Sequence, residues 1–242
     1  QVSPNMQRIT LHGNDLAEFP KSCEGGYLKL LFNHTGGTDL SALTEKERPK
    51  MRTYTIRRYL ADQSAIEIDF VRHTTHDMQC GFASRWAMNV SEGETIHFVG
   101  PGQSADLNTD ANWFFMAADM TALPALSAKI RKLPESSKGY AVIKVIDNKD
   151  IQPINAPKNF EVIWLTEQTP LAERVRALQW LDGDVAVWVA CEFDIMRELR
   201  HYFRNEKGVD RANIYISSYW KQGVSEDGHK LIKMKDSEEY GK

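Results

Sequence analysis

Six residues around position 55 combine two guanidinium groups with a phenol ring and hydroxyl groups. They read Arg52-Thr53-Tyr54-Thr55-Ile56-Arg57. On a strand, Arg52, Tyr54 and Ile56 face one side and the other three face the opposite side, unless the strand bulges. A ring can pack beside an isoalloxazine, a hydroxyl can bond its N5 and O4 edge, and a guanidinium can fork onto phosphate. The segment is a candidate flavin site; the alternative is a barrel strand whose arginines reach solvent.

Two further segments have the composition of ligand sites. Small residues around Ala83-Ser84 enter a helical turn, and the first N–H groups of a helix form an anion site. Asp119 and Thr121 follow an apolar strand, where a doubly wound sheet binds its ligands. Both segments therefore join the candidate binding residues.

The sequence gives little support for a metal site or for hydrolase chemistry. His73 and His76 stand three residues apart beside Asp77, but on a strand or loop this spacing does not bring ligands together, and a third ligand is missing. Neither a Gly-x-Ser-x-Gly elbow nor a Cys–His nucleophile pattern occurs. We expect no protein-held metal.

The first part of the chain predicts short antiparallel strands. Apolar and polar residues alternate with a period of two, and Gly-rich turns separate the segments. Closing such a sheet removes its edges, so residues 1–104 are expected to form a small antiparallel β-barrel. The strands are expected at residues 8–12, 27–32, 53–59, 66–70 and 95–99.

After Gly100-Pro101-Gly102 the pattern changes to strands alternating with helices. This alternation is typical of a parallel sheet covered on both faces. Residues 105–242 are therefore expected to form a doubly wound α/β domain. Its strands are expected at residues 113–118, 140–146, 160–165, 185–190 and 213–217, and its helices at 122–133, 171–181 and 193–203.

Composition and charge limit the classes of partner that this protein is expected to bind. The net charge is −3, which gives no overall argument for a nucleic-acid or membrane partner, and no apolar run approaches the roughly 18 residues of a membrane span. Three widely spaced cysteines without a ligand pattern fit a reducing compartment. The first residues do not resemble a signal peptide. We expect a cytoplasmic protein, with a monomer as the default.

Six motifs, taken together and in order, resemble the siderophore-interacting protein family of the ferredoxin-reductase-like superfamily. Any one of them alone would be weak, but together they span nearly the whole chain. After the R-x-Y-T-x-R strand come Ile68-Asp69-Phe70-Val71-Arg72-His73, Ala83-Ser84-Arg85-Trp86-Ala87, Gly100-Pro101 and Asp119-Met120-Thr121-Ala122-Leu123-Pro124-Ala125, and then Tyr215-Ile216-Ser217-Ser218-Tyr219-Trp220 with Glu226-Asp227.

The resemblance implies that FAD is the cofactor and assigns residues to it. Ring and ribityl contacts would come from Arg52, Tyr54 and Thr55, with Arg57 on phosphate. The neighbouring strand would contribute Asp69, Val71 and His73, and a pyrophosphate cradle would be formed by Ala83, Ser84, Trp86 and Ala87. Asp119 and Thr121 would line the second-domain crevice. Trp220 would cover the flavin or adenine, or else be a packed aromatic at a strand end.

The implied activity is a bacterial FAD-dependent ferric-siderophore reductase that releases iron as Fe(II). NADH, NADPH or a ferredoxin-like protein would supply the electrons, and no catalytic side chain is required because the flavin carries the chemistry. Two alternatives stay open: a general NAD(P)H–flavin oxidoreductase, and a non-catalytic carrier. Negative ferric siderophores predict a basic pocket, with Lys50, Lys221, Lys230, Lys233 and Lys235 as candidates against a solvated basic tail.

The sequence differs from the motifs of this family at three positions. Thr74 replaces Gly and Phe82 replaces Pro beside the expected pyrophosphate loop, and Cys191 replaces a Gly that would let a nicotinamide approach. A GxGxxG dinucleotide fingerprint is also missing from the second domain.

Overall fold

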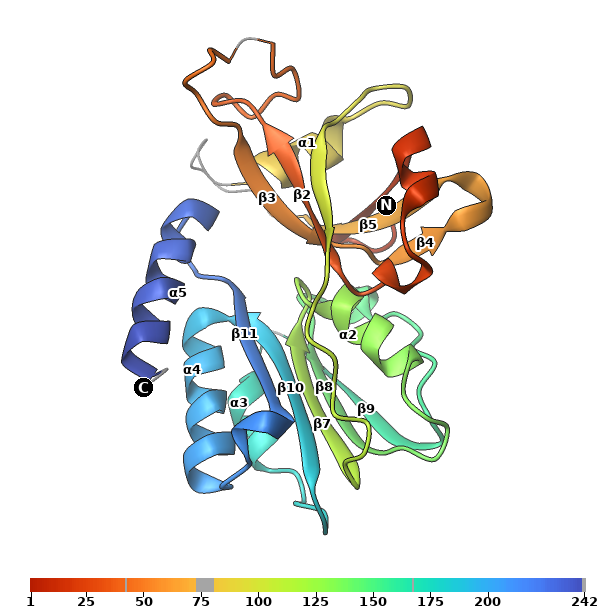
Figure 1. The fold of residues 1–242 in the computed structure, drawn as a ribbon. Helices are drawn as coiled ribbons and strands as arrows, with labels where there is room; N and C mark the ends of the chain where they lie inside the picture. The colour runs from red at the N-terminus through yellow and green to blue at the C-terminus, as the bar shows by residue number, and fades with distance from the viewer. Residues whose placement is uncertain (42, 73–80, 167, 241–242) are drawn as a thin grey trace. The chain divides into compact units, whose positions relative to one another are not determined.

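A computed structural model describes residues 1–41, 43–72, 81–166 and 168–240 of the chain. The chain forms two compact units, Gln1–Ser104 and Ala105–Lys242 (Figure 1). Each unit has a core of its own.

The first unit consists of two three-stranded antiparallel sheets. One has the strand order β1-β5-β4 and the other β3-β2-β6. The antiparallel β-domain expected from the sequence is confirmed. The strands are β1 (Met6–His12), β2 (Tyr27–Phe32), β3 (Lys50–Thr55), β4 (Arg58–Leu60), β5 (Ala65–Val71) and β6 (Phe98–Gly102), and one helix, α1 (Phe82–Asn89), follows β5.

The core of this unit is built from alternate residues of its strands. Leu28, Leu30 and Phe32 on β2 are fully buried, as are Ile66 and Ile68 on β5. Polar neighbours on β5, such as Glu67, lie on the opposite face, so the period of two marks the two faces of the sheet.

β6 begins three residues later than the sequence pattern predicts and includes Gly100-Pro101-Gly102. Proline is tolerated there because β6 is an edge strand and has a partner on one side only. At Gly102 a Cβ atom would stand 2.3 Å from the ring of Tyr27, its partner across the sheet, so this pairing needs glycine.

The second unit is a five-stranded parallel sheet of order β11-β10-β7-β8-β9. The chain starts in the middle of the sheet at β7, runs outward to β9, and crosses back to β10. The predicted doubly wound α/β fold is confirmed, with its switch point between β7 and β10. The strands are β7 (Trp113–Asp119), β8 (Lys138–Lys144), β9 (Asn159–Leu165), β10 (Val185–Glu192) and β11 (Ile214–Trp220).

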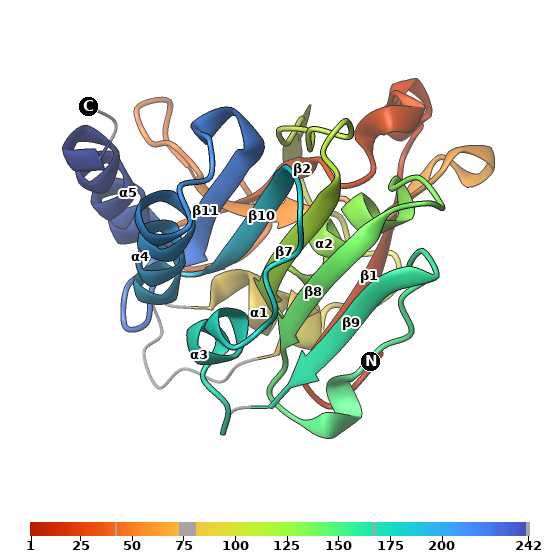
Figure 2. The ribbon, with the colours of Figure 1, turned by 90° about the horizontal axis from the view of Figure 1, so that it is seen from below.

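Helices cover both faces of this sheet (Figure 2). Trp113 and Phe115 of β7 join a core with Val175 of α3 and Leu199 of α4, whereas α2 packs on the other face. Every residue of β10 is buried, as expected for a central parallel strand. The helices are α2 (Leu123–Arg131), α3 (Leu171–Arg176), α4 (Phe193–His201) and α5 (Glu226–Tyr240), and α4 continues into a π-helical turn at Tyr202–Glu206.

Two helices differ from the sequence expectation. α3 ends at Arg176 instead of continuing to Leu181, and Trp180 leaves the helical path to pack edge-on against Trp113 at 4.9 Å between ring centroids. Leu178, Trp180 and Leu181 therefore pack against the aromatic core from outside the helix. α5 is formed by the charged C-terminal segment, for which a solvated basic tail was one expectation. It buries His229 and Asp236.

Candidate functional site

In the first unit, β3 places Arg52 and Tyr54 on the same side of the strand. Arg52 is only 8% exposed, and its guanidinium carbon lies 5.4 Å from the centroid of the Phe82 ring. The Tyr54 ring packs 4.3 Å from Phe70 of β5. Thr55 follows at the end of β3, on the other side. Arg52 is thereby directed toward the start of α1.

The start of α1 has the local structure of an anion site. Gly81 adopts a left-handed conformation with φ of 82° and no side chain caps the helix. The first N–H groups of a helix lack partners within the helix and carry its positive dipole end. The hydroxyl of Ser84 donates to the carbonyl of Val71 at 3.1 Å and so ties α1 to the end of β5.

A second arginine joins Arg52 at this helix end. The guanidinium carbon of Arg85 lies 5.3 Å from the Phe82 ring centroid. Phe82 is 7% exposed, and a Cβ atom at Gly36 would meet its ring at 2.8 Å. The phenyl ring that replaces the expected proline therefore packs beside two cations and against a glycine.

These residues fit the pyrophosphate of FAD. Two guanidinium groups and a set of helix N-terminal amides are the donors that bind a dianionic phosphate pair. The side chains of Ala83 and Ala87 are buried in the core, so these residues would meet a cofactor through their backbone. Trp86 packs against Phe32 and Phe70 at 6.2 and 5.7 Å between ring centroids, and its indole N–H has no partner among the described residues.

Arg57 and Asp69, two of the predicted cofactor residues, contact each other. Arg8 forks onto Asp69 with bonds of 2.7 and 2.9 Å, and Arg57 Nε lies 3.0 Å from the same carboxylate. Arg57 also pairs with Glu67 at 3.0 Å. These contacts raise the pKa of Arg8, chiefly through its hydrogen bonds to Asp69. This network lies on the face of β5 opposite Phe70 and holds β1, β5 and the end of β3 together.

In the second unit, Asp119 ends β7 at the switch point of the sheet. Its Oδ1 accepts from the backbone N–H and the hydroxyl of Thr121 at 2.9 and 2.5 Å. Its Oδ2 accepts from the backbone N–H of Glu192 at 2.9 Å and from the indole of Trp220 at 2.8 Å. Burial raises the pKa of Asp119, and the bonds from Thr121 and Trp220 oppose that shift. The carboxylate thus links the carboxyl ends of β7, β10 and β11.

Glu192 and Lys221 also lie at this end of the sheet. Glu192 caps α4 through the N–H of Asp194 at 2.6 Å, while Lys221 contacts Asp194 at 2.5 Å and Glu192 at 3.8 Å. Cys191 is fully buried, and burial raises the pKa of its thiol well above the ordinary value. The departure from glycine thus places an inert thiol within the sheet.

The lysines proposed from charge alone have different surroundings. Lys221 and Lys230 are paired with carboxylates, Lys230 with Glu226 at 3.5 Å. Lys233 donates to Ser217 Oγ at 3.0 Å and to the Ser218 carbonyl at 2.9 Å. Lys50 begins β3 in the first unit. Lys50 thus belongs to the first unit, and the other three lysines belong to the second.

Sequence reasoning missed Arg85 and the role of Phe82. Both belong to the segment that resembles a family motif, but Arg85 stands at its variable position and Phe82 precedes it. The cue available in the sequence was a cation one helical turn after an aromatic residue, a spacing at which side chains meet.

Predicted ligands between positions 73 and 80 lie outside the described residues. This applies to His73 as a cofactor residue and to the His73, His76 and Asp77 group considered for metal. In the part of the chain that is described, no group of three or more His, Cys, Asp and Glu side chains is arranged to hold a metal ion. None of the described helices is both long and apolar enough to cross a bilayer.

Comparison with known families covers both units. The siderophore-interacting FAD-binding domain matches residues 1–105, and the siderophore-interacting protein family matches residues 111–223. A ferric vibriobactin reductase of Vibrio cholerae is 32% identical over 94% of this chain and 88% of its own length. An NADPH-dependent ferric-chelate reductase of Escherichia coli is 25% identical over 91% of this chain and 89% of its own.

Solved structures agree with the fold of both units. The siderophore-interacting protein of Aeromonas hydrophila superposes with a TM-score of 0.85 at 28% identity, covering 98% of this chain and 94% of that one. A ferredoxin–NADP⁺ reductase of Plasmodium falciparum superposes with a TM-score of 0.64 at 13% identity, covering 90% of this chain and 91% of that one, and shares the fold.

Proposed function

The chain belongs to the siderophore-interacting protein family, and we propose that it is an FAD-dependent reductase that releases iron from a ferric siderophore as Fe(II). The observation that carries this proposal is that Arg52 and Arg85 both lie beside the Phe82 ring at the start of α1, inside a unit that matches an FAD-binding domain. The names of the reductase relatives support the choice of substrate.

The residues of this chain bind and orient the cofactor in this proposal. Arg52, Arg85 and the amides of Ala83 and Ser84 hold the pyrophosphate, and Tyr54 and Thr55 are placed for the ring and its polar edge. When bound, FAD supplies the conversion of a two-electron donor into single-electron steps. Each Fe(III) takes up one electron and leaves as Fe(II), because hard oxygen chelators bind the reduced ion less well.

Four predicted cofactor residues receive a supporting role in this proposal. Arg57 and Asp69 are already paired with each other, so we assign them to holding β5 and the end of β3 in position. Asp119 and Thr121 act in the same way at the carboxyl end of the second sheet, where Asp119 fixes Trp220. Direct contact with FAD is proposed for Arg52, Tyr54, Thr55 and the start of α1.

The electron donor is proposed to be NAD(P)H, supported by the name of the Escherichia coli relative. A monomer in the cytoplasm is proposed as the working form, and the thiols of Cys23 and Cys191 suit a reducing compartment.

An anaerobic absorbance experiment tests the function. The purified FAD-loaded protein is titrated first with NADH or NADPH and then with a ferric siderophore, with a ferrous chelator present. We expect the flavin absorbance to bleach and then to recover as Fe(II) is captured. Bleaching by dithionite but by neither nicotinamide would replace NAD(P)H with a protein donor. Equal reoxidation by quinone would favour a general flavin oxidoreductase, and a protein that takes up no FAD would overturn the proposal.

A further inference from the structure

A hollow of about 370 Å³ lies beside β11 in the second unit, between this strand and helices α4 and α5. Its lining includes four cationic side chains and one carboxylate, Asp236; the cations are Arg200, Arg204, Arg211 and Lys233. This concentration of positive charge occurs in a chain whose net charge is −3. The hollow therefore calls for a physical explanation beyond general solubility.

One of these cations is neutralised within the protein. Arg200 forks onto Asp236 with bonds of 2.6 and 2.7 Å, and the Tyr240 ring stacks on its guanidinium at 4.3 Å. This pair anchors α5 to α4. Because both oxygens of Asp236 are engaged by Arg200, that carboxylate does not compensate the remaining cations.

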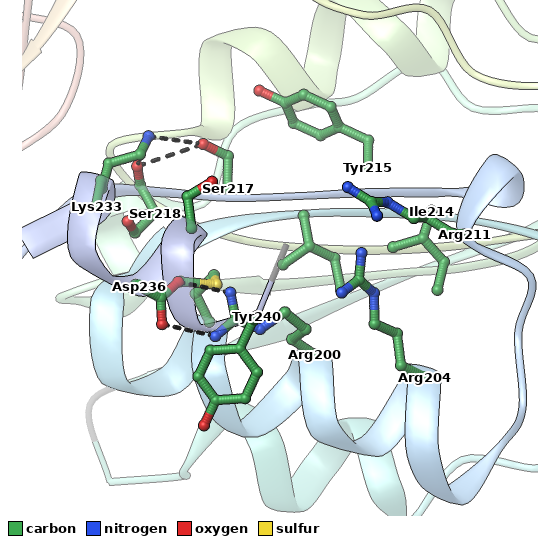
Figure 3. Close-up of a pocket in the computed structure, with 13 residues that line it drawn as sticks. Arg200, Arg204, Arg211, Ile214, Tyr215, Ser217, Ser218, Lys233, Asp236 and Tyr240 are labelled. Atoms are coloured by element: carbon green, nitrogen blue, oxygen red, sulfur yellow. Dashed lines mark hydrogen bonds and ion pairs between the residues drawn. The ribbon is translucent and has the colours of Figure 1, made fainter. Parts of the chain in front are cut away.

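Two arginines of the hollow remain without a carboxylate in the described part of the chain. Arg204 and Arg211 form no ion pair there, whereas Lys233 donates to neutral oxygens of Ser217 and Ser218. Burial lowers the pKa of Lys233, and the negative charge of Glu226 opposes that shift. Figure 3 shows Arg204 and Arg211 with their guanidinium groups toward the same end of the hollow, and Lys233 at the other end. Like charges placed together in this way repel one another unless an anion lies between them.

Arg204 carries a second signal. Its Nε atom is buried and has no hydrogen-bond partner among the described residues. A buried donor without a partner is unfavourable, and such groups in folded proteins commonly mark a bound water or ion. Burial, followed by the charges of Arg211 and Arg200, lowers the pKa of Arg204, which agrees with a cation that gains from an added anion.

The outer edge of β11 adds neutral donors. β11 is the last strand of the sheet, so its outward backbone groups have no strand partner, and Ser217 and Tyr215 also line the hollow. The arginine end of the hollow is distant from the carboxyl end of the sheet. Ile214, which lines that end, and Trp220 are six residues apart on β11, which corresponds to about 20 Å.

We propose that this hollow binds a phosphate dianion, either free or as the phosphate monoester of a small molecule. Two guanidinium groups match phosphate oxygens in a bidentate manner, and two arginine charges without a carboxylate suit a dianion better than a monocarboxylate. The volume lies at the lower end of the range of roughly 300–1,000 Å³ seen for small-ligand sites. In the monoester, the organic part occupies the space along β11 toward Ser217 and Lys233. This inference is independent of the proposed reductase function.

NMR titration of the FAD-loaded protein tests the proposal, since the loaded cofactor excludes phosphate from its own site. Inorganic phosphate, ribose 5-phosphate, ribose and sodium chloride at matched ionic strength are the four titrants. We expect saturable shifts of the Nε–H signals of Arg204 and Arg211 with both phosphates and none with ribose. Tighter binding of ribose 5-phosphate identifies a monoester site, whereas equal or weaker binding identifies free phosphate.

Variants define the site. Arg204→Gln and Arg211→Gln should each weaken phosphate binding about tenfold or more, as expected for the loss of a charged hydrogen bond. Lys138→Gln removes the same charge at an exposed position on β8, three strands away, and should change the affinity less than twofold. The proposal is overturned if the shifts follow chloride and phosphate alike, or if saturable binding is the same in both arginine variants as in the wild type.

Discussion

The indole Nε1–H of Trp220 donates a 2.8 Å hydrogen bond to Oδ2 of Asp119, and this bond joins the carboxyl ends of β11 and β7 across the intervening β10. The same oxygen accepts from the N–H of Glu192 on β10. Three strands therefore meet at one carboxylate, at the position where a doubly wound fold binds its ligands.

Replacing Asp119 with Ala should destabilise the second unit. The substitution leaves the backbone N–H of Glu192, a buried residue, without its acceptor, and an unsatisfied buried donor costs roughly 1–3 kcal/mol. The indole of Trp220 is 39% exposed and can bond to water instead, so we expect a loss of about 1–3 kcal/mol, measured by urea unfolding of the protein. Trp220→Phe removes one donor and keeps the carboxylate, so its cost should be at most half as large. Equal losses in the two variants would contradict a carboxylate shared by three strands.

The ion network of Asp69 leads to a different prediction. Asp69→Asn removes the carboxylate that Arg8 and Arg57 share and leaves only Glu67 beside Arg57, and removing one partner of a buried ion pair costs up to roughly 3–5 kcal/mol. The thermal unfolding temperature of the FAD-free protein should fall. Asp62→Asn, an exposed carboxylate in the same unit, is the matched control and should leave that temperature unchanged. An unchanged temperature combined with a loss of FAD affinity would instead indicate direct cofactor contact by Asp69.

Phe82 should determine how tightly FAD binds. Its ring holds the guanidinium groups of Arg52 and Arg85, and each cation–π contact contributes roughly 0.5–1 kcal/mol at an accessible site. Phe82→Leu should therefore weaken FAD binding about 5–30-fold, measured by the change in flavin fluorescence on binding. Phe82→Tyr keeps the ring and should bind within about twofold of the wild type. If both variants bind FAD equally well, the arginines are oriented by other contacts.

His229 makes the docking of α5 sensitive to acid. Its Nε2 lies 2.8 Å from the Ser218 hydroxyl, and burial, followed by the charge of Lys233, lowers its pKa from 6.5 to about 4. Glu192 acts in the opposite direction, and Lys221 adds to the lowering. Between pH 6.5 and 4 the unfolded chain binds a proton that the folded protein does not, so stability present above pH 6.5 is lost as the pH falls through this window.

Hydrogen exchange of the α5 amides measures this effect. Exchange should be faster at pH 5 than at pH 7 after correction for the intrinsic rates, and His229→Gln should reduce the difference. An NMR titration should place the midpoint of His229 near 4. A midpoint near 6.5 would show that the imidazole is not held as described.

The elements that position the site were predictable where burial repeats along the chain. β2 was expected from residue 27 to residue 32 and has those bounds, because a half-buried strand leaves a period of two. β10 was found because a strand buried on both faces is an apolar run. α5 was missed because its attachment is polar: an ion pair at Asp236 and hydrogen bonds at His229 and Lys233 leave no apolar stripe in the sequence.

The site itself was predictable only in part. The motifs located Arg52, Tyr54 and the start of α1, but not which side chains bond to one another. The pairing of Arg57 with Asp69 depends on where β4 and β5 place residues that are twelve positions apart. The basic hollow combines residues of α4, α5 and the turn before β11, and the sequence carries no spacing that brings these segments together.

The position of α5 has a consequence for how this protein behaves at high concentration. β11 is an edge strand, and an uncovered edge of this kind is a template for pairing with a strand of another molecule. Lys233 of α5 already bonds to the Ser218 carbonyl on that strand. α5 therefore hinders strand-to-strand pairing between molecules at this edge. Acid that loosens the docking of α5 would promote self-association before it unfolds the sheet.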